Sequence, residues 1–355
     1  MNDLLIITYD ANDLDIYNNI NLPFAFDNIK IISFYKTEKE HCKWKNVIIN
    51  TVDNYSYEIS QWKNVYFAPS LLILEDNYLK NLLLVTFQKK KKIFLSKEIE
   101  LFCLQDSELS TEIVFYNNGF LNKETLEKAN EKIFELRTPI VFVTGILEHM
   151  DKFSLFLAIV QGVKEKGLKV LAFGSKAEAQ FWNLRSIPEY MFGGQIQEKD
   201  KIILFNHYIK KLEILEEPDL IIMCIPGEIG RYDNDAVGNL GVMLWLLKQI
   251  APPDYLFCSI PFSHYSLQDL ENLKKYIQNT AGVCCNSLHL SNKMINKVQT
   301  QRKGDMHFIR IRRSEIEKEI KKLLGQVCSV FTSDLHLEIE KMLNHLYENG
   351  YIEIV

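Results

Sequence analysis

The chain has 355 residues, 47% of them hydrophobic and 25% charged, and a formal net charge of −5. This length and composition are typical of a globular protein with about two domains. The negative charge argues against general binding to nucleic acid or anionic membranes, and no apolar run approaches the ~20 residues that span a bilayer. The opening MNDLLIITYDAND carries acids where a signal peptide carries lysines, so we expect a cytoplasmic protein.

Seven cysteines are present, and no two form a C-x-x-C pair. An odd number without metal-ligand spacing signals neither a disulfide framework nor an iron–sulfur or zinc site. The sequence also lacks an H-E-x-x-H motif and an ordered Ser-His-Asp set. We therefore expect no bound metal and no cofactor, and the residues alone identify no catalytic group.

Residues 1–120 contain short apolar runs, beginning with LLIITYD, separated by polar turns and short helix-compatible stretches. This pattern predicts a small α/β domain with a largely parallel sheet. The lysine run Lys89–Lys92 is typical of a solvated strand edge rather than a binding patch. Residues 121–137, with NKETLEKANEKIFELR, predict a charged connecting helix.

Residues 138–312 alternate strands and helices more regularly, which predicts a doubly wound, mostly parallel sheet. We expect a strand at 140–144, a helix at about 151–166 and a strand at 169–173. Helix caps are predicted at Asp200, at Ser266 and in a Ser175-x-x-Glu178 capping box. The segment MHFIRIR (306–312) is predicted to be the last strand of this domain.

The tail, residues 313–355, predicts two helices, the second capped by Asp334, and a terminal strand YIEIV. It can serve as a short helical appendage that binds a partner, or it can pack against the main domain. Both alternatives stay open from the sequence.

The segment TPIVFVTGILEHMDKF (138–153) carries the strongest functional signal. Its Gly145 and Lys152 stand at the spacing found in dethiobiotin-synthetase-like P-loops, whose glycines, lysine and hydroxyl hold phosphates and Mg²⁺. Here Asp151 replaces the glycine before the lysine and Phe153 replaces the hydroxyl after it. We therefore predict a degenerate P-loop fold that has lost its nucleotide chemistry.

Ligands of parallel sheets bind at the carboxyl ends of the strands, so we expect a crevice lined by the turns at 144–149, 173–175, 225–230 and 260–264. We expect the cleft formed by the two domains to include residues 188–194 and 206–207 as well. The segment SIPEYMFGG reads as a non-helical surface loop that suits peptide binding. Glu228 stands where a P-loop enzyme keeps a Mg²⁺-binding acid, although a glutamate in such a Pro-Gly turn more often belongs to a structural turn. The candidate substrate-binding residues are Gly145, Glu148, Lys152, Glu189, Tyr190, Asn206, His207, Gly227 and Glu228.

Six segments in combination resemble one clostridial family, the peptide maturation system proteins. They are IITYD, TPIVFVTGILEHMDKF, SIPEYMF, DKIILFNHYIKKLE, PDLIIMCIPGEIG and NLGV. Members of this family are encoded beside radical SAM maturases and short Cys-rich precursor peptides. The resemblance implies a role in making a ribosomally synthesised, post-translationally modified peptide, and it carries no catalytic residues across.

From these features we expect an accessory protein that binds the precursor peptide or the maturation enzyme, with neither nucleic acid nor membrane as a partner. One alternative is a pathway enzyme, in which Lys152 binds an anionic substrate and Glu228 or His207 acts as the acid–base group. Another is a structural subunit that acts through homo-oligomer formation.

Overall fold

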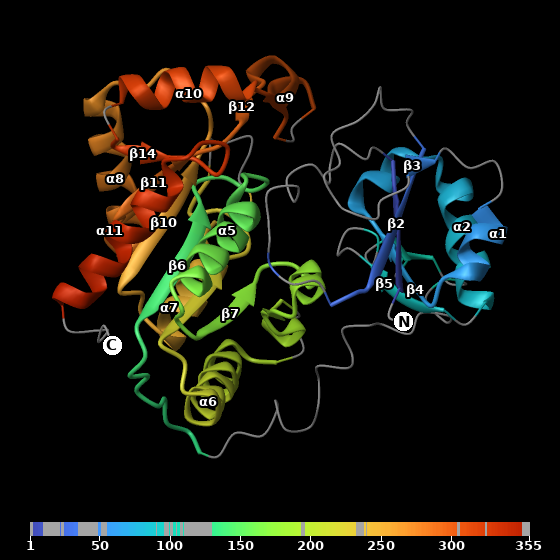
Figure 1. The fold of residues 1–355 in the computed structure, drawn as a ribbon, viewed down its shortest axis with the longest axis horizontal. Helices are drawn as coiled ribbons and strands as arrows, with labels where there is room; N and C mark the ends of the chain where they lie inside the picture. Colours follow the sequence, from blue (N-terminus) through green and yellow to red (C-terminus); the bar gives the residue numbers. More distant parts are fainter. Residues whose placement is uncertain are drawn as a thin grey trace. The chain divides into compact units, whose positions relative to one another are not determined.

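The computed structural model describes residues 3–9, 22, 25–34, 49–50, 55–89, 91–95, 99, 102–103, 105–106, 109, 130–192, 196–231, 238, 240–303, 306–323 and 325–349. The chain forms two compact units (Figure 1). One comprises Met1–Glu124 with Lys176–Glu189, and the other comprises Thr125–Ser175 with Tyr190–Val355. Each contains a parallel sheet with helices, so the predicted α/β class is confirmed.

The first unit is built on five parallel strands in the order β3-β2-β1-β4-β5. The strands are β1 (Asp3–Thr8), β2 (Asn28–Ser33), β3 (Ile49–Asn50), β4 (Asn64–Phe67) and β5 (Lys92–Leu95). The helical segments are α1 (Tyr55–Gln61), η2 (Pro69–Ile73), α2 (Asp76–Gln88) and η5 (Ala177–Trp182). Central strands such as β1 are buried along almost their whole length, as expected where helices cover both faces of a parallel sheet. β5 begins at Lys92 and is the last strand in the order, so the lysine run leads into an edge strand, as predicted.

The segment 176–189 carries a correction to the predicted capping box. η5 is a 3₁₀ helix that begins after Lys176 without a side-chain cap. Glu178 instead accepts a hydrogen bond from the Tyr66 hydroxyl at 2.7 Å in a buried site. Ser175 Oγ lies 3.2 Å from Cys224 Sγ. The Ser-x-x-Glu box is therefore wrong, because both side chains have other partners.

The second unit is built on six strands in the order β14-β11-β10-β6-β9-β7. They are β6 (Ile140–Gly145), β7 (Val170–Gly174), β9 (Leu220–Cys224), β10 (Tyr255–Ile260), β11 (Ser287–Leu290) and β14 (Val327–Cys328). The two-residue strand β8 (Arg185–Ser186) belongs to the segment 176–189 of the first unit. The pairs that join β14 through β7 are parallel. β6 is central, and all six of its residues are buried.

Helices flank this sheet (Figure 1). They are α5 (Lys152–Glu165), η6 (Glu189–Met191), α6 (Glu198–Glu216), α7 (Val242–Ile250), α8 (Leu267–Ala281), α9 (Lys297–Lys303), α10 (Arg313–Lys322) and α11 (Leu335–Glu348). Phe153, Leu157 and Val160 of α5 are buried at the predicted i, i+4, i+7 spacing. Ser266 caps α8 as predicted, in a capping box with Asp269. α6 begins at Glu198, so Asp200 lies in its first turn and is not its cap.

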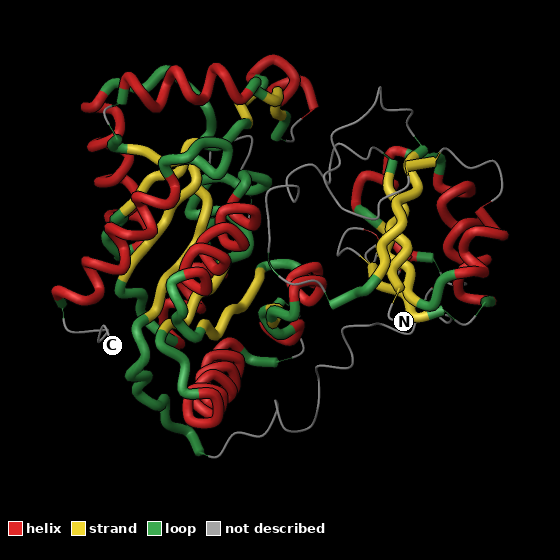
Figure 2. Tube along the Cα trace, in the orientation of Figure 1, coloured by secondary structure: helices red, strands yellow, loops and turns green. Residues whose placement is uncertain are grey.

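The predicted connecting helix is wrong where the structure describes it. Residues 130–138 have no helical turn (Figure 2); residues 121–129 lie outside the described part. Side chains of α6 bind this backbone in place of helical hydrogen bonds. Asn206 Oδ1 accepts from Phe134 N at 2.7 Å, and Glu213 Oε1 accepts from the N–H groups of Arg137 (2.7 Å) and Thr138 (2.8 Å).

A small hairpin replaces the last predicted strand of the large sheet. β12 (Lys293–Ile295) pairs antiparallel with β13 (Phe308–Arg310), and Met294 lies opposite Ile309. The MHFIRIR segment is therefore extended, but it belongs to this hairpin. Its strand is only three residues long and pairs with its close neighbour in sequence.

The C-terminal tail is part of the second unit. β14 extends the sheet beside β11, and Ile339 of α11 packs on Gly162 of α5, where an added Cβ would lie 2.6 Å from Ile339 Cδ1. Lys166 and Glu340 join the same two helices at 2.7 Å. Asp334 is the N-cap of α11, but its side chain makes no capping hydrogen bond. The predicted strand at 351–355 lies outside the described residues.

Candidate functional site

The loop between β6 and α5 lies at the carboxyl edge of the large sheet. Ile146 N donates to Ser259 O in β10 at 2.9 Å, and Ile229 N donates to Gly145 O at 3.1 Å. A Cβ on Gly145 would lie 2.8 Å from Leu147 O, so the loop requires glycine there. We call this loop, residues 145–152, the cradle. It meets the end of β10 and the turn at 225–230.

Lys152 occupies the position of a P-loop lysine at the start of α5. Its side chain is buried, and Nζ donates to the carbonyl of Gly227. Gly227 has a φ of +75°, a conformation that favours glycine. The ammonium group is thus bonded to the chain's own turn at the place where a P-loop lysine meets phosphate.

Asp151 precedes Lys152, and its side chain is fully buried. Although it is the N-cap of α5, its carboxylate makes no capping hydrogen bond. Oδ2 accepts instead from Ser291 Oγ at 2.5 Å and from Asn292 N at 3.0 Å. Lys293 Nζ lies 3.9 Å from Oδ1. A carboxylate therefore supplies negative charge inside the cradle and joins it to the chain after β11.

Phe153 fills the position of the P-loop hydroxyl. Its side chain is buried, and its ring stacks on Phe156 with centroids 5.9 Å apart. An aromatic ring offers no oxygen to Mg²⁺. With Asp151 and Phe153 in these positions, the cradle lacks the glycine and the hydroxyl with which a P-loop holds phosphate and Mg²⁺.

Glu228 is buried in the turn after β9, and its carboxylate lies against Gly238. A Cβ on Gly238 would come within 2.5 Å of Glu228 Oε1. Glu148 is half-buried and His149 is exposed in the cradle, where His149 has a φ of +59° and its carbonyl accepts from Lys293 Nζ. Among the described residues, no group of three or more His, Cys, Asp or Glu side chains is arranged to hold a metal ion.

Asn206 and His207 lie at the opposite edge of the sheet from the cradle. Asn206 Nδ2 donates to Phe134 O (2.9 Å) and to Ile250 O (3.0 Å), which precede β6 and β10 respectively. His207 Nε2 bonds to Lys132 O at 2.7 Å. The expected crevice therefore does not include these two side chains, because α6 uses them to hold the strand that enters the sheet.

Tyr190 is also not part of an exposed loop. It lies in η6, is only 7% exposed, and burial together with nearby Tyr208 raises the pKa of its hydroxyl far above the usual range. The interpretation of 188–194 as an aromatic surface loop is wrong at this residue, because the ring packs inward. The side chain of Glu189 and residues 193–195 lie outside the described part of the structure.

A buried hydrogen-bond chain beside the cradle was not anticipated from the sequence. Ser259 Oγ and His289 Nδ1 lie 2.9 Å apart, and His289 Nε2 accepts from Val330 N at 3.1 Å. The ring proton must then reside on Nδ1 and point to the serine, so this histidine cannot remove the serine proton. Burial lowers the pKa of His289 to about 4, opposed by the charge of Asp151. A lone histidine in the apolar strand SLHL was the only sequence signal.

An open groove of about 920 Å³ adjoins the cradle. Its walls come from the cradle, the turn after β10, α8 and the β12–β13 hairpin. It is lined by Ile146, Leu147, Arg231, Pro261, Phe262, Ser263, Tyr265, Leu273, Tyr276, Met294, Ile295, Asn296, Lys297, Val298 and Ile309. Most of these side chains are aliphatic or aromatic, and two are cationic. The sequence interpretation included the turn after β10 but missed the hairpin wall.

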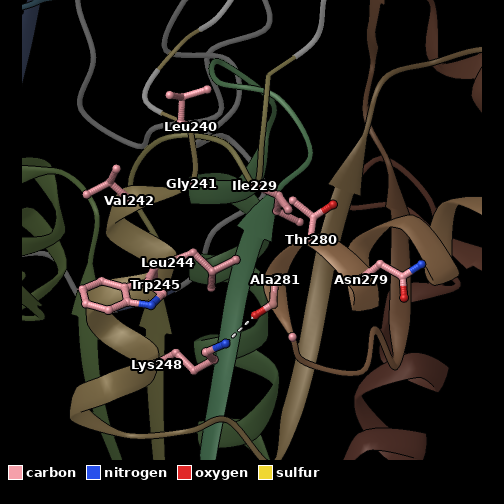
Figure 3. A pocket seen from close by; sticks show the side chains of 11 residues that line it. Ile229, Leu240, Gly241, Val242, Leu244, Trp245, Lys248, Asn279, Thr280 and Ala281 are labelled. Atoms are coloured by element: carbon pink, nitrogen blue, oxygen red, sulfur yellow. Dashed lines mark hydrogen bonds between the residues drawn. The ribbon is translucent and has the colours of Figure 1, made fainter.

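A smaller pocket of about 390 Å³ lies between α7 and the end of α8 (Figure 3). Lys248 Nζ crosses it to donate to Ala281 O at 2.7 Å. Leu240, Val242 and Trp245 lie along it with more than half of their surface exposed. This pocket is apolar and contains none of the predicted site residues.

No protein-family model and no curated protein matches the chain. Among solved structures, it is similar to a DUF1611 family protein from Anabaena variabilis, with a TM-score of 0.59, 9% identity, and coverage of 95% of this chain and 99% of that one. Weaker matches are the hydrogenase maturation factor HypB from Archaeoglobus fulgidus (TM-score 0.28, 10% identity, 64% of this chain and 97% of that one) and a signal recognition particle 54 kDa protein from Aeropyrum pernix in complex with GDP (0.32, 12%, 78% and 65%).

The first likeness shows a shared fold alone. The other two structures are too dissimilar to indicate a shared overall fold. Within the described segments, no helix combines the length and apolarity needed to cross a bilayer.

Proposed function

We propose that this protein is an accessory protein in the maturation of a ribosomally synthesised, post-translationally modified peptide, and that it binds the precursor peptide or the maturase. The sequence resemblance to the clostridial peptide maturation system proteins supplies the pathway. The proposed place of action is the cytoplasm, where a ribosomal precursor is made.

The observation that carries this proposal is the open apolar groove beside a closed cradle. At about 920 Å³ the groove can receive several side chains of a peptide. Apolar grooves bind peptides through side-chain anchors. The polar groups of the cradle, by contrast, bond to the chain itself: Lys152 to Gly227 and Asp151 to Ser291 and Asn292.

The same geometry gives less support to the alternative of a pathway enzyme. Lys152 and Glu228 are buried near the carboxyl edge of the sheet, whereas His207 bonds to Lys132 at the other edge. None of the three lines the groove. An anionic substrate bound at Lys152 would therefore lie at the opposite edge of the sheet from His207, and Glu228 is buried in its turn.

The alternative of an oligomerising subunit has one observation in its favour. Leu240, Val242 and Trp245 expose apolar surface around the smaller pocket, and such surface is common at protein–protein contacts. Light scattering after size exclusion tests it directly. If the protein stays monomeric at concentrations from roughly 1 to 100 µM, which are on the order of ordinary dimer dissociation constants, this alternative is wrong.

The main test first looks beside the gene for a short Cys-rich reading frame and a radical SAM maturase, and the absence of both would contradict the proposal. Binding of that precursor peptide is then measured by fluorescence anisotropy, and binding of the maturase by size exclusion. Val298→Asp places a carboxylate on an exposed aliphatic position of the groove wall. We expect it to weaken binding at least tenfold, about 1.4 kcal/mol. Leu215→Asp is the matched control, because Leu215 is similarly exposed on α6 and lies outside the groove. If neither partner binds the wild-type chain, the proposal is wrong.

A further inference from the structure

The wall of the groove that includes the β12–β13 hairpin has an unusual charge. Residues 293–313 contain seven Lys and Arg residues and one acidic residue, whereas the rest of the chain contains 34 basic and 45 acidic residues. A basic segment in an otherwise acidic protein concentrates positive potential at one place. The segment that forms this wall is therefore more basic than the rest of the chain.

Two of the groove's cations are placed to act on a ligand. Lys297, at the start of α9, and Arg231, after the turn at 225–230, both line the groove and are exposed. In the part of the chain that the structure describes, neither forms an ion pair with a carboxylate. Arg313, in contrast, pairs with Glu317 at 2.9 Å. The charges of Lys297 and Arg231 are thus directed to the groove and its solvent.

The hairpin wall is held in place without a ligand. Phe262 N donates to Lys293 O at 2.7 Å, which joins the hairpin to the turn after β10. Asn296 N donates to His307 O at 2.8 Å and closes the end of the hairpin. The side chain of Lys293 reaches the cradle, where Nζ bonds to His149 O. A preformed wall lowers the ordering cost of binding.

The same wall presents aliphatic surface between its charges. Val298 is 58% and Ile309 is 44% exposed, and Met294 and Ile295 lie beside them in the groove. Aliphatic surface is best covered by aliphatic side chains, and cations at a rim select carboxylates. A nucleic acid would satisfy the cations through its phosphates but leave the aliphatic wall uncovered.

We infer that the groove binds an acidic peptide segment in which aliphatic side chains alternate with carboxylates. This inference rests on the proposed function, because it assigns the chemistry of the partner's segment to the same groove. The aliphatic side chains fill the space between the hairpin and the cradle, and the carboxylates meet Arg231 and Lys297.

The test uses the full chain and four fluorescein-labelled ten-residue peptides, in which Leu alternates with Glu, Gln or Lys, or Ser alternates with Glu. Anisotropy at low and moderate salt gives the affinities, with a ten-nucleotide oligo-dT as a further probe. We expect the Leu/Glu peptide to bind at least tenfold more tightly than every other probe. Its advantage should shrink as salt rises, because exposed charges are screened.

The variants Arg231→Glu and Lys297→Glu should each weaken binding of the Leu/Glu peptide about tenfold or more, because each removes a charge pair with a peptide carboxylate and about 1.4 kcal/mol corresponds to tenfold. Binding of the Leu/Gln peptide, which has no carboxylates on its alternating side chains, should change by less than about twofold. Lys199→Glu makes the same charge change at an exposed residue of α6 outside the groove and should leave binding unchanged. All three changes are at exposed side chains, and the melting temperature of each variant is compared with that of the wild type.

Three outcomes overturn the inference: equal binding of Leu/Glu and Leu/Gln, tighter binding of oligo-dT, or wild-type affinity in both groove variants. These results separate from failure of the proposed function. If the precursor or maturase binds but is not displaced by Leu/Glu peptide, the inference fails and the function stands. If Leu/Glu binds in the groove but neither precursor nor maturase binds the chain, the inference stands and the function fails.

Discussion

The cradle and the groove lie side by side at the carboxyl edge of one sheet, yet they use their polar groups in opposite ways. In the cradle, Lys152 and Asp151 are buried and bonded to Gly227, Ser291 and Asn292 of the same chain. In the groove, Arg231 and Lys297 face open space lined by apolar side chains. A fold that binds ligands at this edge has filled one position with its own side chains and left the neighbouring one accessible.

The comparison shows why motif position alone is a weak guide to a site. A charged residue in a ligand-binding loop has functional meaning only if its charge is left for a ligand. Each buried hydrogen bond made to the chain itself turns such a residue into a structural one. Variants can test which of the two roles each residue has.

Replacing Tyr190 should have the largest effect on stability, and it tests whether this residue belongs to the binding site or to the core. Because its ring is buried in η6, Tyr190→Ala should lower the free energy of unfolding by about 3–5 kcal/mol. Its hydroxyl has no hydrogen-bond partner among the described residues, so Tyr190→Phe should change stability by less than about 1 kcal/mol. Urea denaturation of the three proteins measures both differences. An unchanged stability in Tyr190→Ala would return this residue to the list of exposed binding candidates.

Asp151 tests whether the cradle is closed by structure. Asp151→Ala leaves Asn292 N–H and the Ser291 hydroxyl without their acceptor, and we expect a loss of about 2–4 kcal/mol in the free energy of unfolding. Asp151→Asn keeps one acceptor oxygen and should cost less than half as much. The measurement is again denaturant unfolding. A stability gain in Asp151→Ala would mean that the buried carboxylate is a strained functional group, and the contrast with the groove would fail.

The sequence predicted those parts of the fold that depend on local pattern. The apolar runs of β6, β9 and β10 and the periodicity of α5 are set by burial in a parallel sheet. The sequence also showed that the cradle lacks P-loop chemistry, because Asp151 and Phe153 are the wrong residue types for phosphate and Mg²⁺. The class of the fold followed from the alternation of these elements.

Long-range hydrogen bonds explain what the sequence did not reveal. Residues 130–138 have a helical composition, but Asn206 and Glu213, about 70 residues away, bind their backbone in an extended form. Tyr190 lies between Pro188 and the glycine pair 193–194, which suggests an exposed loop, but its ring packs inward. The groove wall comes from a hairpin whose second strand, β13, has the pattern of an ordinary strand of the sheet. No local pattern states which of these partners a segment will find.

His289 gives a smaller effect, with a defined pH range. Its pKa is about 4 in the folded protein and about 6.5 when unfolded. As the pH falls, the imidazole of His289 takes up a proton in the unfolded chain before it does so in the folded protein. The contribution of neutral His289 to stability is therefore complete above pH 6.5 and is lost as the pH falls toward 4. Between pH 7.5 and pH 5 the loss should be about 2 kcal/mol. The variant His289→Gln should show a flatter profile over this range, whereas equal slopes would mean that another group controls acid stability.

Nucleotides should have no effect on thermal stability, and this prediction tests the difference between the cradle and the groove most directly. If ATP bound the folded protein with a Kd of about 10 µM, then about 1 mM ATP would be roughly 100 times the Kd. Mass action would in that case raise the free energy of unfolding by about 2.7 kcal/mol. We expect no rise in Tm with ATP or GTP and Mg²⁺, because Lys152 is bonded to Gly227, Asp151 places negative charge in the cradle, and Phe153 offers no oxygen. The Leu/Glu peptide, bound next to the cradle, should raise Tm under the same conditions. If ATP raised Tm and the peptide did not, the cradle would be the open site, and the search for function would return to phosphate chemistry.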